Sequence, residues 1–569
     1  MSRHNSHSDA WYESVGRWLS GSPKRKRGSE ETGARQATVE YLENRQLLSA
    51  SNTSGTNPGS ANTASSPEQT AAQSSSSSTT TTTHGVDGNG NPTTTTTVTT
   101  TTTDENGNVT TSSTSTTTVD GTTEALSTSI DTDQALGMAL QADGKMILVG
   151  AVQIDALGNY DFGVTRLNAD GSLDTSFGTN GKKTISFDLG GLSANGSVSF
   201  NQDVATCVAI QADGKIVVGG YAQRDGTGNF DFAVVRLNTN GSLDTTFSSD
   251  GKAVVAFDYG GGGDDRATGI ALQADGKIVL VGYCQKQALG DNDIALARLK
   301  TDGSLDTSFT GDGRKAIGFN NSGTGDDRGA AVKIQADGRI VVVGYAQAGG
   351  TGNDDFAVAR VTTTGSMDKS FSSDGKKTIA FNLGGTGNDR ATSVALQSDG
   401  GIVVGGSASS ALGDGDFGVV RIKKNGSLDK TFSGDGKKTV AFNLGASLED
   451  QATGVVIQAD GSIVLSGLVQ VSATGDFDFA AARLTTAGEL DTAFSTDGKK
   501  TIAFNMGGSD NDVANGLVLQ PDGKIVLFGH ALRTDPANTD FAVARLDSDG
   551  QLDTSFGAGG LKTIPFDLT

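Results

Sequence analysis

An arginine and an aspartate recur eight residues apart along the second part of the chain, as in Arg360 and Asp368. A guanidinium and a carboxylate at this spacing can form a bidentate, charge-assisted contact when a turn brings them together. Seven such pairs cannot all belong to one active site. We therefore interpret them as a structural contact that ties the last segment of each repeat to its own sheet. The pairs are Arg166–Asp174, Arg236–Asp244, Arg298–Asp306, Arg360–Asp368, Arg421–Asp429, Arg483–Asp491 and Arg545–Asp553.

The residues needed for catalysis are sparse. The chain has four histidines, and only His530 lies beyond residue 125. No His/Cys cluster has the spacing of a zinc site, and no nucleophile elbow accompanies the histidine. Carboxylates are numerous, but no pair stands out as the acid and base of a glycosidase. We therefore expect a protein that is not an enzyme.

Acidic loops are the main candidates for metal binding. Asp264, Asp265, Asp326 and Asp327 lie in Gly/Asp-rich segments between repeats. Ca²⁺ takes six to eight oxygen ligands, so such loops could hold it. The structural alternative is that Asp and Gly form Asx-turns and an acidic, soluble surface. No cofactor is expected otherwise.

One position varies while its surroundings do not. The residue after the glycine that ends the second strand of each repeat is Ala151, Tyr221, Tyr283, Tyr345, Ser407, Leu468 or His530. Three tyrosines in adjacent repeats could form a stacking strip for sugars or peptides, since an aromatic ring combines an apolar face with a polar tip. Tyr221, Tyr283, Tyr345 and His530 are thus the ligand-binding candidates. The alternative is aromatic packing between repeats.

These residues all belong to a repeated unit. A Gln-x-Asp-Gly turn begins at Gln141, Gln211, Gln273, Gln335, Gln397, Gln458 and Gln520, with spacings of 70, 62, 62, 62, 61 and 62 residues. Within residues 329–381, alternating and β-branched runs separated by Asp-Gly or Thr-Gly turns predict a four-stranded antiparallel meander. Seven units at a nearly fixed period indicate a repeat architecture.

The repeats predict a closed ring. A single meander cannot bury both faces, and an open stack needs polar terminal units. The first and last units carry the same apolar pattern as the others, so we predict an all-β, seven-bladed β-propeller. Closure by simple contact or by addition of residues 128–130 to the last blade both remain open. The Asp-Gly turns emerge on one face of the ring, and the variable acidic loops emerge on the other.

The repeated unit resembles a known family. Its pattern, ALQxDGKIVVxG followed by DFAVARLxxDGSLDxSFxxDGKKTIAF, is similar to the delta-60 repeat of bacterial surface and secreted β-propellers. The resemblance covers roughly residues 134–569. It implies the propeller fold and an extracytoplasmic setting, and it brings no reaction and no functional residues.

The first 125 residues differ in composition. Residues 1–50 contain Leu42-Glu43-x-Arg45-x-Leu47-Leu48-Ser49-Ala50, which resembles the LExRxLLSA segment of planctomycete-type surface proteins and implies export or anchoring. Residues 51–125 form a Ser/Thr-rich low-complexity segment, for which we expect a flexible or extended stalk. Residues 126–569 form the propeller.

These observations predict a bacterial protein at or outside the cell surface. The formal net charge of −21 argues against nucleic-acid partners. No apolar run is long enough for a transmembrane helix, and we expect a monomeric ring. Its predicted function is non-catalytic binding or adhesion through the acidic variable face, with a polysaccharide or a surface protein as partner. The alternatives are a structural display scaffold without a ligand and a propeller glycan hydrolase or lyase.

Overall fold

The computed structural model describes three strands before the ring and most of the ring itself. The described residues are 75–86, 92–103, 109–119 and 132–566, except 156–157, 188, 190–201, 225–228, 260–262, 288–290, 320–324, 349–352, 385–386, 410–414, 445–448, 473–475, 507–510 and 534–537. The expectations for residues 1–50 lie outside the described residues.

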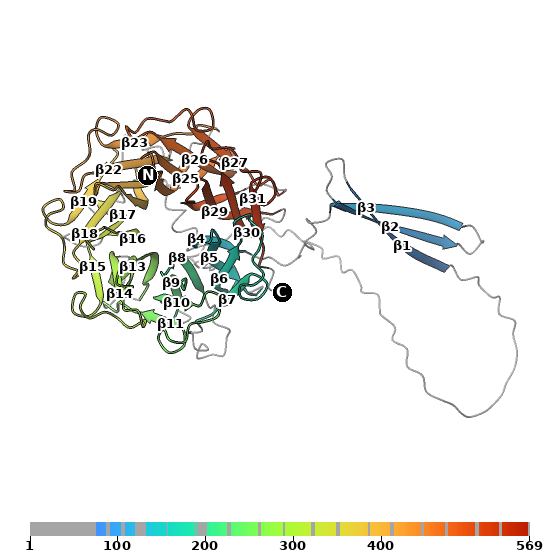
Figure 1. The fold of residues 1–569 in the computed structure, drawn as a ribbon, viewed down its shortest axis with the longest axis horizontal. Helices are drawn as coiled ribbons and strands as arrows, with labels where there is room; N and C mark the ends of the chain where they lie inside the picture. Colours follow the sequence, from blue (N-terminus) through green and yellow to red (C-terminus); the bar gives the residue numbers. More distant parts are fainter. Residues whose placement is uncertain are drawn as a thin grey trace, which may run out of the picture. The chain divides into compact units, whose positions relative to one another are not determined.

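Seven four-stranded sheets are arranged as blades of a ring (Figure 1). The first blade contains β4 (Gln134–Leu140), β5 (Met146–Gln153), β6 (Tyr160–Leu167) and β7 (Lys182–Ile185). In each blade the four strands follow one another in chain order. Every pairing is antiparallel. The predicted seven-bladed propeller of four-stranded meanders is therefore confirmed.

The other six blades repeat this arrangement. The second blade has β8 (Asp203–Ile210), β9 (Ile216–Gln223), β10 (Phe230–Leu237) and β11 (Lys252–Val255); the third has β12 (Arg266–Leu272), β13 (Ile278–Gln287), β14 (Asp291–Leu299) and β15 (Arg314–Ile317). The fourth has β16 (Asp327–Ile334), β17 (Ile340–Ala348), β18 (Asn353–Val361) and β19 (Lys376–Ile379); the fifth has β20 (Arg390–Leu396), β21 (Ile402–Ser409), β22 (Gly415–Ile422) and β23 (Lys437–Val440). The sixth has β24 (Asp450–Ile457), β25 (Ile463–Gln470), β26 (Phe477–Leu484) and β27 (Lys499–Ile502); the seventh has β28 (Val513–Leu519), β29 (Ile525–Leu532), β30 (Thr539–Leu546) and β31 (Leu561–Ile564).

The core lies between blades. Seven large clusters of buried side chains each combine residues of two neighbouring blades, as where Val341, Phe356 and Phe381 of the fourth blade meet Val404 and Val420 of the fifth. The second and third strands are buried along almost their whole length because neighbouring blades cover both faces of each sheet. Apolar burial between blades therefore supplies the main driving force for the ring.

The ring closes by direct contact between the seventh and first blades (Figure 1). Phe541 and Phe566 of the seventh blade pack with Met146 and Leu148 of the first. The backbone nitrogen of Asp133 donates to the carbonyl of Thr539 at 2.7 Å, next to a parallel bridge between Thr132 and Thr539. The alternative, addition of residues 128–130 to the last blade, lies outside the described residues; among the described ones, no segment adds a fifth strand to the seventh blade, whose four strands are consecutive in the chain.

A separate sheet precedes the ring in the chain. β1 (Ser75–Val86), β2 (Pro92–Thr103) and β3 (Val109–Val119) pair in antiparallel order, with threonines opposite one another along most of the register. This sheet and the ring belong to different compact units. Threonine favours extended backbone, so the segment expected to be a flexible or extended stalk contains regular strands between 75 and 119.

Candidate functional site

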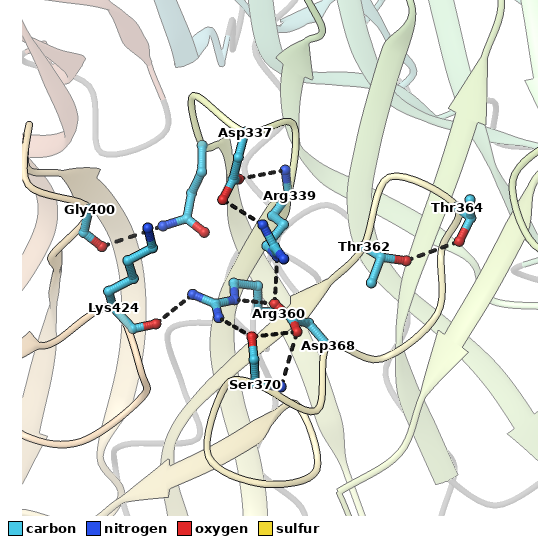
Figure 2. Close-up of polar contacts among 10 residues, drawn as sticks. Asp337, Arg339, Arg360, Thr362, Thr364, Asp368, Ser370, Gly400 and Lys424 are labelled. Carbon is cyan, nitrogen blue, oxygen red and sulfur yellow. Dashed lines mark hydrogen bonds and ion pairs between the residues drawn. The ribbon is translucent and has the colours of Figure 1, made fainter.

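The repeated arginine and aspartate meet as expected, but they do more than hold one blade together (Figure 2). Arg360, on β18, donates from Nε to Oδ2 of Asp368 at 2.8 Å and from Nη2 to the Ser370 hydroxyl at 3.1 Å. Its Nη1 donates to the carbonyl of Lys424 in the fifth blade at 2.6 Å. The expected bidentate contact with the aspartate is absent, since one nitrogen crosses to the next blade instead.

All seven arginines share the contacts of Nε and Nη1, and all except Arg483, which has Ala493 at the position of Ser370, also donate from Nη2 to a hydroxyl. Each Nε lies 2.6–2.9 Å from the aspartate oxygen. Each Nη1 donates to a carbonyl in the following blade. The carbonyls belong to Thr239, Thr301, Thr363, Lys424, Thr486, Ser548 and Ala169. Ala169 lies in the first blade, so the same contact joins the seventh blade to the first. These arginines therefore link each blade to the next, and we call them the interblade arginines.

The loop aspartates proposed as calcium ligands have other partners. Asp327 is 1% exposed, and its carboxylate accepts backbone hydrogen bonds from Phe319 of the third blade at 2.7 Å and Gln347 of the fourth at 3.2 Å. Asp265 is bound in the same way by Phe257 and Gln285. Burial raises the pKa of both carboxyl groups to about 6. These carboxylates cap the backbone at a blade junction, which is the structural alternative to calcium binding.

The same buried aspartate occurs at every junction. In each case one carboxylate oxygen accepts the backbone N–H of a phenylalanine that follows the fourth strand of the preceding blade. The aspartates are Asp133, Asp203, Asp265, Asp327, Asp389, Asp450 and Asp512. We call them the junction aspartates. The remaining calcium candidates, Asp264 and Asp326, pair with Arg266 and Arg328 at 2.7 and 2.9 Å. Within the described residues, no group of three or more His, Cys, Asp or Glu side chains is arranged to hold a metal ion.

The three candidate tyrosines are buried, which contradicts the exposed stacking strip. Tyr221, Tyr283 and Tyr345 are 5%, 6% and 2% exposed. The reason is that each side chain lies under an arginine from the first strand of the following blade. The guanidinium carbons of Arg266, Arg328 and Arg390 lie 4.8, 4.6 and 4.8 Å from the ring centres of Tyr221, Tyr283 and Tyr345, respectively. The packing interpretation of the tyrosines is therefore the correct one.

His530 also lies in this register position but does not join the tyrosines in a site. Its Nδ1 is 3.4 Å from the amide nitrogen of Asn515, which itself donates to the carbonyl of Ala135 in the first blade. Burial lowers the pKa of His530 to about 4, so the imidazole is neutral at pH 7. The contact supports the seventh junction of the ring.

The feature that sequence reasoning missed is the set of arginines above the tyrosines. Arg266, Arg328 and Arg390 occupy equivalent positions in three consecutive blades, and each side chain is 14–21% exposed. We call these three residues the arginine arc. Each guanidinium is held at one edge by a carboxylate and on one face by an aromatic ring. The sequence could have indicated these arginines, because three blades have an Asp-Arg dipeptide, at Asp265, Asp327 and Asp389. The other four blades have Gln or Val after the same aspartate.

The arc lies on the face of the variable loops. Each of its arginines stands at or just after the start of the first strand of a blade, where the chain enters from the inter-blade loop. In each blade this strand is nearest the middle of the ring (Figure 1). The opposite face carries the uniform Asp-Gly turns and the interblade arginines. The three arginines, which differ from the residues at this position in the other blades, thus lie near the middle of the ring on the face of the variable loops.

The two cysteines contribute nothing to this site. Cys207 and Cys284 are both buried and are not joined to each other. Burial raises the pKa of the Cys207 thiol to about 12, so it remains protonated. Both cysteines are buried, unpaired thiols in the ring.

The sequence matches a family of propellers. Seven segments match the family described as "Domain of unknown function (DUF5122) beta-propeller" at residues 141–177, 211–247, 273–309, 335–371, 397–432, 458–494 and 520–556. The chain is therefore a repeat β-propeller protein. Each matched segment runs from the first Asp-Gly turn to the phenylalanine beneath the interblade arginine. No curated protein matches the sequence.

Solved structures share only the general fold. PorZ, a bacterial surface component of the type-IX secretion system of Porphyromonas gingivalis, is 10% identical with a TM-score of 0.36; the match covers 78% of this chain and 50% of PorZ. A leech intramolecular trans-sialidase is 12% identical with a TM-score of 0.34, over 73% of this chain and 68% of that one. An exo-1,5-α-L-arabinanase from a bovine ruminal metagenomic library is 11% identical with a TM-score of 0.28, over 50% and 93%. These similarities carry no functional argument.

In the part of the chain that the structure describes, no helix has the length and apolar character needed to cross a bilayer.

Proposed function

We propose that this protein is a non-catalytic binding module of the bacterial cell surface or exterior, and that it binds its partner on the face of the variable loops. The observation that carries the proposal is the arginine arc. Arg266 and Arg328 are rigidly held, partly exposed cations at positions where the repeat pattern is broken. Variable features on one face of a rigid scaffold are the usual location of binding residues.

Rigid placement is what distinguishes these arginines from ordinary surface cations. A free arginine loses side-chain entropy when a ligand immobilises it. Arg328 is already fixed by the carboxylate of Asp326 and by the rings around it. A ligand at the arc would therefore meet an arranged set of donors at a small entropic cost.

A display scaffold without a dedicated ligand is the second candidate. The burial of Tyr221, Tyr283 and Tyr345 favours it, because these rings are not available to stack on a sugar. The same packing joins the second to the fifth blade at three successive junctions. The two functions differ in one measurable respect, which is whether the loop face has an affinity for anything.

A face-selective blocking experiment tests the proposal. The full-length protein would be screened for binding to a panel of bacterial polysaccharides and surface proteins, and then screened again after a polymer is attached to one face. Leu383→Cys places a thiol on the loop face, where Leu383 is 41% exposed, and Asp337→Cys places one at a turn on the opposite face. Buried Cys207 and Cys284 leave the new thiol as the reactive one.

We expect the polymer at residue 383 to abolish binding and the polymer at residue 337 to leave it unchanged. The reverse result would assign binding to the turn face and refute the proposal. An absence of binding across the panel would favour the display scaffold.

A further inference from the structure

The arginine arc presents hydrogen-bond donors in a fixed direction. Nε of Arg266 donates to Asp264, and Nε of Arg328 donates to Asp326. With Nε engaged, the terminal nitrogens form the remaining edge of each planar guanidinium. Apart from these aspartates and the neighbouring aromatic rings, neither arginine makes a hydrogen bond or an ion pair with a residue that the structure describes.

Such an edge has a natural ligand. Two parallel N–H groups of a guanidinium match the two oxygens of a carboxylate or sulfate group. Arg390 is less available, because Asp354 binds both its Nε and its Nη2 at 2.6 Å. The two open positions of the arc are therefore Arg266 and Arg328.

The aromatic rings hold the guanidiniums in a continuous row. Arg266 lies 4.8 Å from the ring centre of Tyr221 and 4.1 Å from that of Phe230. Tyr283 pairs with Arg266 across β12 and β13 and lies beneath Arg328 of the next blade. Tyrosines and arginines thus alternate from the second blade to the fifth. Because the arginines occupy equivalent positions in consecutive blades, the row suits a ligand with anionic groups at regular intervals.

The carboxylates beside the arginines define the ligand further. Asp264 is 33% exposed, and its Oδ2 makes no hydrogen bond to a described residue. Asp326 is 24% exposed, but its Oδ1 also accepts the side-chain amide of Asn292 at 2.7 Å and its Oδ2 accepts the hydroxyl of Tyr345 at 3.1 Å. Asp264 is therefore the acceptor that the row offers next to its donors. A ligand that carries only negative charge would be repelled by the two aspartates, whereas one that also carries hydroxyl groups can donate to Asp264.

We propose that Arg266 and Arg328, with Asp264, bind an acidic polysaccharide built of uronate units, in which sugar carboxylates pair with the arginines and an adjacent hydroxyl group donates to Asp264. This inference rests on the proposed binding function and names its ligand class. Acidic peptides fit less well, since their side chains carry carboxylates without hydroxyl donors. The site requires no metal ion.

The experiment uses the full-length protein and a galacturonate hexamer as the probe, with binding measured by calorimetry at low salt. Arg266→Gln and Arg328→Gln each remove one carboxylate contact, so we expect each to weaken binding roughly tenfold or more. Arg328→Lys keeps the charge and loses the paired donors, and it should restore only part of the affinity. Higher salt should weaken binding to the unaltered protein.

The matched control is Arg224→Gln. Arg224 follows β9 on the same face, is 49% exposed, and lies 3.5–3.6 Å from Asp231 and Asp258. Its loss changes the charge of the face by the same amount without touching the arc, so affinity for the hexamer should not change. A thermal melt of each variant shows whether it is folded. If a glutamine variant does not fold, the lysine variant at the same position provides the test.

Three comparison probes separate the outcomes: a neutral glucan hexamer, dextran sulfate and poly-glutamate. Binding of the uronate alone, weakened by the arc variants, supports the inference. Tight binding of poly-glutamate or dextran sulfate through the same arginines would overturn the uronate assignment. Binding of the neutral glucan, unaffected by Arg266→Gln, would leave the proposed function standing and refute this inference. If none of these probes binds, this inference fails, whereas the proposed function fails only if the panel of polysaccharides and surface proteins is also silent.

Discussion

Replacement of one interblade arginine should destabilise the whole ring. Arg360→Met removes a guanidinium that is 2% exposed and that joins Asp368, Ser370 and the carbonyl of Lys424. Loss of one partner from a buried ion pair costs about 3–5 kcal/mol. Asp368 keeps a second cation, Arg339, at 2.8 Å, so we expect the lower end of that range, about 3 kcal/mol.

The expected change in melting temperature follows from the size of the ring. Unfolding entropy near 60 °C is about 2 cal/mol/K per residue, so a ring of roughly 430 residues should lose about 3 °C. Differential scanning calorimetry can resolve this shift. The matched control is Arg339→Met, because Arg339 contacts the same aspartate but is 37% exposed. Exposed pairs contribute about 0–1 kcal/mol, so the control should melt within about 1 °C of the unaltered protein. Equal shifts for both variants would show that the contact to the next blade contributes nothing.

Two further predictions concern protonation. Burial raises the pKa of Asp265, Asp327, Asp389 and Asp450 to about 6, so the folded state binds protons that the unfolded chain releases between about pH 4 and 6, and stability should rise when the pH falls from 7 to 5. His530 opposes this with a single group. Asp368, whose pKa is lowered to about 2, loses its contribution only between about pH 4 and 2, which is below this window. A melting temperature that falls steadily from pH 7 to pH 5 would contradict the prediction. The surrounding protein also partly desolvates the Lys333 amine on β16 and lowers its pKa, while the side chain still reaches solvent at a position where the other blades have Ala or Val. Limited acylation at pH 7.5 followed by peptide mapping should therefore modify Lys333 ahead of the other lysines. Equal modification of Lys145 and Lys333 would count against it.

The architecture was accessible from the sequence because each level of the pattern agreed with the others. Asp-Gly turns, alternating apolar residues and a period near 62 residues all predict the same four-stranded unit, and seven copies without polar end units predict closure. The pairing of Arg360 with Asp368 also followed from local spacing. Its contact with Lys424 did not, because the distance between blades depends on the packing of whole sheets.

The candidate site was harder to predict for the same reason. Tyr221, Tyr283 and Tyr345 vary from blade to blade, which resembles a binding surface in sequence. Their exposure depends on what the next blade places above them, and that residue, such as Arg266 above Tyr221, is 45 positions away in the chain. Asp265 and Asp327 likewise read as loop acids, although they are buried caps. Repeats predict what lies within a unit better than what lies between units.

Closure by contact makes the seventh junction chemically equivalent to the other six. The junction aspartate, the interblade arginine and the aromatic core occur there as elsewhere, with Asp133 binding Phe566 and Arg545 binding Ala169. The four strands of each blade are consecutive in the chain, so in the described residues the seventh junction differs from the others only in lacking a covalent link between its two blades. A circular permutant that joins residues 566 and 132 and opens at any inter-blade loop would retain every contact between blades. The position of the chain termini could therefore be moved to another inter-blade loop without a change in the contacts of the ring.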